Sequence, residues 1–172
     1  ARVLVVDDDE SVCVYCSAAL AEFDNVEVTT EHRSLRAEKL CRKGGFDLIL
    51  TDLSMPDTDG VQILKASRET NPDVPVIIMT GYPSLDNSVE CLRLGAADYV
   101  LKPLRVDDLL TTVSRVLDER RLRQENRLLR SQLERKSSTV EILGKTEAIG
   151  KACFSPTICA PALRKGPSGL MA

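Results

Sequence analysis

The residues best suited to chemistry are acidic, and they follow short apolar runs. Asp7, Asp8 and Asp9 come directly after the first run, and Asp52 comes just after the third. If Asp7, Asp8 and Asp52 meet at one edge of a sheet, their charges repel, which raises carboxyl pKa values. A hard divalent cation relieves that repulsion. Mg²⁺ is the predicted cofactor because it takes one or two carboxylates, a carbonyl oxygen and waters, and leaves room for phosphate.

Two more polar residues end later apolar runs. Thr80 offers a hydroxyl donor, and Lys102 offers a positive charge that can pair with a phosphoryl oxygen. The whole set is typical of an aspartyl-phosphate site, in which a carboxylate attacks phosphorus as the nucleophile. We predict Asp52 as that nucleophile, since it stands alone, while Asp7 and Asp8 suit metal binding. The simpler alternative is that these acidic residues only cap helices and line turns.

The scaffold for these residues is predicted from apolar runs of strand length, most of them rich in β-branched residues. The runs lie at 3–6, 26–30, 48–50, 74–79 and 99–101. Segments of helical period separate them, and a last helix starts at about Val106. This alternation predicts a doubly wound α/β fold, with a five-stranded parallel sheet and an extended C-terminal helix. In such sheets the functional residues gather at the carboxyl ends of the strands.

Apolar residues at helical spacing mark the face that each intervening helix should turn to the sheet. The residues so marked are Val12, Tyr15, Cys16, Ala19 and Leu20 in the first segment, Leu35 and Leu40 in the second, Val61 and Leu64 in the third, and Leu85, Val89 and Leu92 in the fourth.

Length and composition limit how many domains the chain can form and which partners it can bind. The chain has 172 residues, enough for one domain and an appendage, and 43% hydrophobic residues suit a packed core. The net charge is −3, whereas nucleic-acid-binding domains usually have a basic surface. We therefore expect no direct nucleic-acid binding by this chain. With neither a signal peptide nor a membrane-length apolar run, we expect a cytoplasmic protein that does not contact the membrane.

The cysteines and the histidine are expected to be structural. The six cysteines are Cys13, Cys16, Cys41, Cys91, Cys153 and Cys159. A reducing cytoplasm with free thiols is the simplest interpretation. Cys13 and Cys16 form a C-x-x-C, but at the spacing of two core-facing positions on a predicted helix. His32 is the only histidine, and we expect it on a surface loop.

Residues 1 to about 117 resemble the receiver domain of bacterial response regulators, the CheY-like family. The matching motifs are Val-Val-Asp7-Asp8-Asp9, Asp52-Leu-Ser-Met55-Pro56-Asp-Thr-Asp-Gly60, Met79-Thr80-Gly81 and Gly95-Ala96-Ala97-Asp98-Tyr99-Val-Leu-Lys102-Pro103. The resemblance implies a flavodoxin-like sheet of order 2-1-3-4-5. It implies a signalling switch and not an enzyme, with a histidine kinase as the partner that donates phosphate to Asp52.

The resemblance also assigns the other site residues. It implies Mg²⁺ held by Asp7, Asp8, Asp52 and the main-chain carbonyl of Ser54. It implies Lys102 as the phosphate contact, Thr80 and Tyr99 as the switch pair, and a cis peptide bond between Lys102 and Pro103. In this family Ser54 and Tyr82 stand where residues tune the phosphoryl lifetime, and the bulk of Tyr82 predicts a long one. The alternative for Tyr99 is plain packing on the sheet.

The last helix has a heptad pattern beyond the receiver. Leu122, Asn126, Leu129 and Leu133 repeat at spacings of four, three and four, which predicts a coiled-coil homodimer with Asn126 in its core. The arginines between 120 and 130 mix with acids, so we interpret them as a solvated face. The alternative is a single helix packed on its own receiver.

Residues 123–130 and the sequence Ile142-Leu143-Gly144-Lys145 resemble the linker of NtrC-type regulators. That family continues into an AAA+ ATPase that remodels sigma-54 RNA polymerase, and then into a DNA-binding helix-turn-helix. After about Lys151 the sequence departs from the family, with no G-x-x-x-x-G-K-[ST] loop. We therefore expect a receiver at 1–117, a dimerisation linker at 118–136, and at 137–172 a remnant of the AAA+ linker with a disordered tail, truncated before a complete AAA+ domain. A shortened chain, a changed reading frame and a natural short product all remain open.

Three functions remain to be separated. The leading hypothesis is a phosphorylation-controlled receiver that regulates a sigma-54-type transcription activator. The second is a metal-dependent phosphatase with an aspartyl nucleophile, which would need a second catalytic aspartate close after Asp52 and an inserted cap domain. The third is an adaptor that binds partners through its helix without being phosphorylated.

Overall fold

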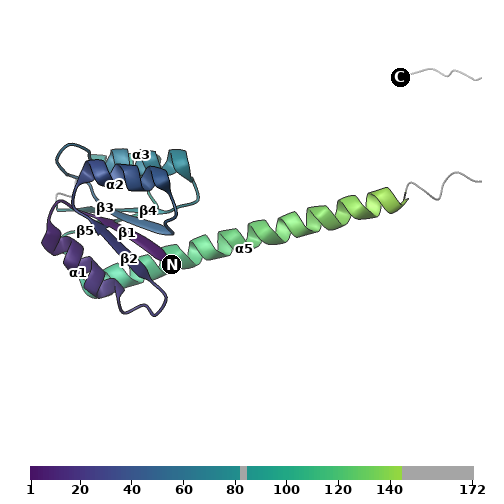
Figure 1. Cartoon of the computed structure of the whole chain (residues 1–172), viewed down its shortest axis with the longest axis horizontal. Coiled ribbons are helices and arrows are strands. Elements are labelled where there is room, and N and C mark those ends of the chain that lie inside the picture. The colour runs from purple at the N-terminus through teal and green to yellow at the C-terminus, as the bar shows by residue number, and fades with distance from the viewer. Residues whose placement is uncertain (82–84, 145–172) are drawn as a thin grey trace, which may run out of the picture. The chain divides into compact units, whose positions relative to one another are not determined.

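The fold is a parallel sheet of five strands with helices between them. The computed structural model describes residues 1–81 and 85–144, leaving aside the side chains of 85–88 and 136–144. In chain order the elements are β1 (Arg2–Val6), α1 (Glu10–Leu20), β2 (Glu27–Glu31), α2 (Ser34–Lys43), β3 (Leu48–Asp52), α3 (Gly60–Thr70), β4 (Val76–Thr80), α4 (Leu85–Arg93), β5 (Asp98–Leu101) and α5 (Val106–Gly144). All strand pairs are parallel in the order β2-β1-β3-β4-β5 (Figure 1). The predicted fold class and strand order are confirmed.

Helices cover both faces of the sheet, and each face has its own hydrophobic core. α2 and α3 lie on one side, and α1 and the start of α5 lie on the other (Figure 1). The strand pattern follows from this burial, because β3 and β4 are buried at every position. Strands enclosed on both faces have continuous apolar runs, as the sequence has at 48–50 and 76–79.

In two helices, some of the large apolar residues predicted to face the core point to solvent instead. In α2 the buried residues are Ser34, Ala37 and Cys41. Leu40 packs against the core as predicted, but Leu35 is exposed. In α4 Cys91 is buried, while Val89 and Leu92 are exposed. The face predicted from the large side chains was therefore wrong at these positions. Small residues allow a helix backbone to lie close to its neighbours, and the longer side chains then reach solvent at its flanks.

The fourth strand is shorter than predicted. It begins at Val76 and not at Val74, because Pro75 has no amide hydrogen to donate to the sheet. The carbonyl of Pro75 still accepts a hydrogen bond from the Ile49 amide at 3.1 Å.

The thiols in the described part of the chain are core residues. Cys13, Cys16, Cys41 and Cys91 are free and buried. Burial raises the pKa of Cys13 to about 11 and that of Cys16 to about 12, so both thiols stay protonated at neutral pH. The C-x-x-C thus faces the core as predicted, and His32 is exposed in the loop after β2. Cys153 and Cys159 lie outside the described residues.

α5 is continuous from Val106 to Gly144, so the boundary expected after residue 117 is not marked by a break in the helix. Ala1–Arg130 forms one compact unit, and Ser131–Ala172 is a second unit. Residues 145–172 lie outside the described residues, and so does most of the tail that we expected to be disordered. Across the described helices, none combines the length and the apolar character that crossing a membrane requires.

The start of α3 is pressed against the end of β3. Asp59 caps the helix by accepting a hydrogen bond from the Gln62 amide at 2.8 Å, and the Gly60 amide donates to the Leu53 carbonyl at 3.0 Å. A Cβ atom at Gly60 would lie 2.3 Å from the carbonyl oxygen of Asp52. Glycine is therefore required here by the close approach of two backbone segments.

We predict that Gly60→Ala lowers the free energy of unfolding by about 1–3 kcal/mol, because the new methyl group must displace backbone. Chemical denaturation followed by circular dichroism measures this. Gly81→Ala is the matched control, since no described atom lies within 4 Å of a Cβ there, and it should change stability by less than about 0.5 kcal/mol. Equal effects of the two substitutions would contradict this explanation.

Candidate functional site

Four strand ends bring the predicted residues to one edge of the sheet. Asp7 follows β1, Asp52 is the last residue of β3, Thr80 is the last of β4, and Lys102 follows β5. The register places Asp52 opposite Met79, and Thr80 opposite Leu101. Because all strands run parallel, these carboxyl ends share one edge, as we expected from the sequence.

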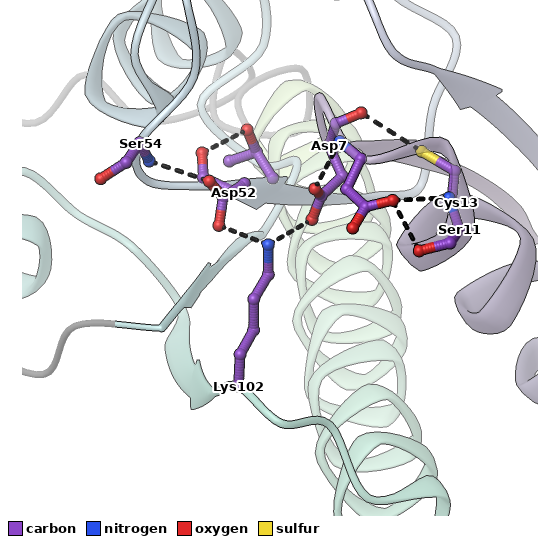
Figure 2. Close-up of polar contacts among 8 residues, drawn as sticks. Asp7, Ser11, Cys13, Asp52, Ser54 and Lys102 are labelled. Atoms are coloured by element: carbon purple, nitrogen blue, oxygen red, sulfur yellow. Dashed lines mark hydrogen bonds and ion pairs between the residues drawn. The ribbon is translucent and has the colours of Figure 1, made fainter.

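An ammonium group lies between two carboxylates at the centre of this edge. The Nζ of Lys102 is 2.6 Å from Oδ2 of Asp7 and 2.8 Å from Oδ1 of Asp52 (Figure 2). Both carboxylates are buried, and Asp7 has no exposed surface. One positive charge thus offsets much of the repulsion between two negative charges that water cannot screen.

The pKa values reflect this competition between burial and charge. Burial raises the pKa of Asp7, and this effect exceeds the opposing hydrogen bond from Lys102. Burial alone would lower the pKa of Lys102, but its contacts with Asp52 and Asp7 outweigh that effect and raise it. The lysine is therefore charged at neutral pH, which a contact for phosphate requires.

Backbone amides fix the orientation of both carboxylates. The Asp9 amide donates to Oδ1 of Asp7 at 3.1 Å, and the Ser54 amide donates to Oδ2 of Asp52 at 3.0 Å (Figure 2). Each carboxylate therefore has one oxygen on an amide and the other on Lys102. With both oxygens held, the side chains cannot turn away from each other.

The loop that carries Lys102 is held from two sides. The Lys102 amide donates to the Thr80 carbonyl at 2.7 Å, and the bond between Lys102 and Pro103 is cis, as expected. On the other side, the Tyr15 hydroxyl donates to the Leu104 carbonyl at 2.9 Å. We had predicted that Tyr15 lies on the buried face of its helix, but its side chain is partly exposed. The hydrogen bond from Tyr15 to Leu104 joins residues 89 positions apart, so no local sequence pattern could predict it.

The donor set suits a small hard cation only in part. Asp7 and Asp52 already share one cationic group, so their oxygens are placed to bind a positive charge between them. Asp8 is exposed, and no group of three His, Cys, Asp or Glu side chains in the described part of the chain is placed to hold a metal. Two carboxylates, a carbonyl and waters are still the set that Mg²⁺ accepts. Asp8 and the Ser54 carbonyl therefore stay predicted ligands.

The predicted switch residues lie beside this site. Thr80 is buried, and Tyr99 is half-buried with its ring against the core on the α2–α3 side. The Tyr99 hydroxyl is buried and has no hydrogen-bond partner in the described part of the chain. Tyr82, for which we expected an effect on phosphoryl lifetime, lies outside the described residues.

Comparison with known proteins identifies the family. The sequence model of the response regulator receiver domain matches residues 3–114, and the chain belongs to this family, which is a signalling family and not an enzyme family. The chain is 42% identical over 120 residues to the transcriptional regulatory protein ZraR of Klebsiella oxytoca, covering 70% of this chain and 27% of ZraR. It is 33% identical over 147 residues to the DNA-binding transcriptional regulator NtrC of Escherichia coli (strain K12), covering 86% and 30%. The expected NtrC-type relationship is confirmed, and the chain spans about a third or less of these relatives.

Solved structures agree with the fold. A CheY-like receiver domain protein from Methanospirillum hungatei JF-1 is 34% identical, with a TM-score of 0.66, and the match covers 71% of this chain and 97% of that one. The beryllofluoride-activated NtrC4 receiver domain, solved as a dimer, is 37% identical, with a TM-score of 0.64, and the match covers 69% and 98%.

We predict that Lys102→Met destabilises the chain at pH 7 by about 2–4 kcal/mol, because it leaves two buried carboxylates without their shared counter-charge. Thermal or urea unfolding measures the loss, and millimolar Mg²⁺ should restore part of it. Lys65→Met, at an exposed position on α3, is the control and should have little effect. A stability equal to that of the control would show that the bridge contributes nothing.

Proposed function

We propose that this chain is a phosphorylation-controlled receiver in which Asp52 accepts a phosphoryl group from a histidine kinase. The observation that carries the proposal is the single ammonium of Lys102 within 2.8 Å of both Asp7 and Asp52 at the carboxyl edge of the sheet. A structural salt bridge needs only one carboxylate. A second buried carboxylate costs stability, which is expected where it serves a reaction.

The proposed transfer uses the residues already held in place. An oxygen of Asp52 attacks the phosphorus of the donor as the bond to the kinase histidine breaks, which forms the aspartyl phosphate. Lys102 shifts from Asp52 to a phosphoryl oxygen, where it offsets the incoming charge. The Thr80 hydroxyl donates to another phosphoryl oxygen. The Ser54 amide keeps the other carboxylate oxygen directed away from the donor.

The proposed metal ligands are Asp7, Asp8, Asp52 and the main-chain carbonyl of Ser54. Bound Mg²⁺ would neutralise charge on the phosphoryl oxygens. Asp7 and Asp52 would be the best-positioned of these ligands, because backbone amides of Asp9 and Ser54 hold their carboxylates in place.

The proposed output is a change on the Tyr99 side of the sheet. Phosphorylation adds roughly 1.5–2 negative charges, toward which Thr80 can move, and this makes room for Tyr99 to turn inward. Moving from 1% to 99% active takes about 5.5 kcal/mol, which two or three charge-assisted hydrogen bonds can supply. The unpartnered Tyr99 hydroxyl supports this role, because a new position costs it no hydrogen bond in the described part of the chain.

The proposed assembly is a homodimer through α5 that controls a sigma-54-type transcription activator. Leu122 and Leu129 support it, since both are 60% exposed on a heptad seam. The dimeric NtrC4 receiver and the NtrC-type relatives also support it. We place the chain in the cytoplasm, where its free cysteines would stay reduced.

We predict that acetyl phosphate with Mg²⁺ adds one phosphoryl group to the chain, and that Asp52→Asn abolishes this, as intact mass spectrometry can measure. Asp57→Asn, at an exposed carboxylate of the adjacent loop, should still be phosphorylated. Continuous release of phosphate would favour the phosphatase alternative. No mass change in the wild-type chain would favour the adaptor.

We also predict that Leu129→Asp breaks the dimer in sedimentation experiments, because it buries a charge in the seam. The control is Leu128→Asp, which is 63% exposed but lies off the heptad seam and should leave association unchanged. Wild-type sedimentation with and without beryllofluoride tests the link to phosphorylation. A wild-type chain that is monomeric in both states would rule out dimerisation by this helix.

A further inference from the structure

The face of α5 that packs on its own sheet continues beyond the hydrophobic core. Leu109, Val113 and Val116 are buried and repeat at spacings of four and three. The next positions in this series include Arg120 and Arg127, which are seven residues apart and so lie on the same side of the helix. The helix thus turns arginine toward the domain where its apolar side chains end.

Both arginines contact aspartates of the domain. Arg120 pairs through Nη1 with Oδ1 of Asp47, and its side chain is only 12% exposed. Asp47 also accepts a hydrogen bond from the Arg2 amide at 2.8 Å, so it joins the start of β1 to α5. The interpretation of these arginines as a solvated face was therefore wrong for Arg120, because a partner 73 residues away in sequence holds it.

Arg127 makes its contact about two turns further along α5 than Arg120. Its two Nη atoms pair with the two oxygens of Asp73, Nη2 to Oδ1 at 2.8 Å, which is the bidentate geometry that guanidinium and carboxylate favour. The hydrogen bond from Arg127 lowers the pKa of Asp73, so the carboxylate is ionised at neutral pH. The Asp73 amide donates to Oδ1 of Asn71 at 3.0 Å, which fixes the turn that carries this partner.

The two aspartates belong to the edge of the sheet opposite the phosphorylation site. Asp47 comes directly before β3, and Asp73 comes shortly before β4. The arginines therefore attach α5 at the amino ends of the strands, beyond the end of the apolar packing. Arg68, Asp73, Arg120 and Arg123 line a cavity of about 220 Å³ here, so the contact between α5 and this edge is polar where the hydrophobic core has ended.

The contact leaves the proposed dimer seam open. Leu122, Asn126 and Leu129 are exposed while Arg120 and Arg127 are paired. The two sets lie on different faces of the same helix turns, so one helix can hold its own domain and a second helix together.

We infer that Arg120 and Arg127 dock the linker part of α5 (118–130) onto Asp47 and Asp73, and so fix the direction in which each receiver presents its seam leucines. The docking is a property of the single chain. Only its consequence for the orientation of two receivers rests on the proposed dimer. A receiver that changes shape can then turn the seam through a rigid helix, which a flexible linker could not do.

Hydrogen exchange tests the docking in a Leu129→Asp background, in which the proposed dimer is broken. Arg120→Ala with Arg127→Ala should speed amide exchange in 118–130 by about threefold or more, and leave 109–116 unchanged. The matched control is Arg121→Ala with Glu125→Ala, which removes an ion pair within the helix on a side away from Asp47 and Asp73, and should have a smaller effect. Each double variant introduces two alanines into the same part of α5, so their effects on helix propensity are similar and the comparison isolates the contacts with the domain.

A charge exchange sharpens the test. Asp73→Arg alone should speed exchange in 118–130, and adding Arg127→Asp should restore protection, because the pair is re-formed with its charges reversed. Equal exchange in the two alanine variants, or no rescue by the reversed pair, would overturn the docking. Sedimentation of the wild-type chain reports separately on the dimer, so a failed dimer and a failed dock are distinguishable.

Discussion

The structure depends on one arrangement of charge, the ammonium of Lys102 between the buried carboxylates of Asp7 and Asp52. Without the lysine, two like charges would be held together away from water, which is costly. With it, both carboxylates share one counter-charge, and each also accepts a hydrogen bond from a backbone amide, that of Asp9 or Ser54. The proposed phosphoryl site is therefore already formed in the structure, and in our proposal a phosphoryl group draws the lysine away from Asp52.

The rest of the fold positions these three side chains. Parallel strands bring the ends of β1, β3, β4 and β5 to one edge, and Gly60 lets α3 start directly against the end of β3. The loop after β5 is held by the Thr80 carbonyl and the Tyr15 hydroxyl, so Lys102 is anchored on both sides. At the opposite edge, α5 is attached through Asp47 and Asp73. The proposed phosphorylation site thus lies at the carboxyl ends of the strands, and the proposed docking of α5 lies at their amino ends.

The features that could be predicted from the sequence are those that depend on a local pattern of residues. Buried parallel strands have continuous apolar runs, so the sheet and its polar strand ends could be predicted, and Asp7, Asp52, Thr80 and Lys102 with them. Contacts between distant segments leave no such pattern, so the bond from Tyr15 to Leu104 and the pair between Arg120 and Asp47 were not predicted. The predictions for Leu35 in α2 and for Val89 and Leu92 in α4 were wrong, because the size of a side chain does not tell how closely a helix approaches the sheet.

The most direct test of the central claim is the ¹⁹F spectrum of the chain with beryllofluoride and Mg²⁺. We expect signals of a bound phosphoryl mimic that require Mg²⁺, vanish in Asp52→Asn, and include one fluorine that shifts in Lys102→Ala. A bound signal that persists in Asp52→Asn, or none in the wild-type chain, would contradict a phosphoryl site built on this lysine and these two carboxylates.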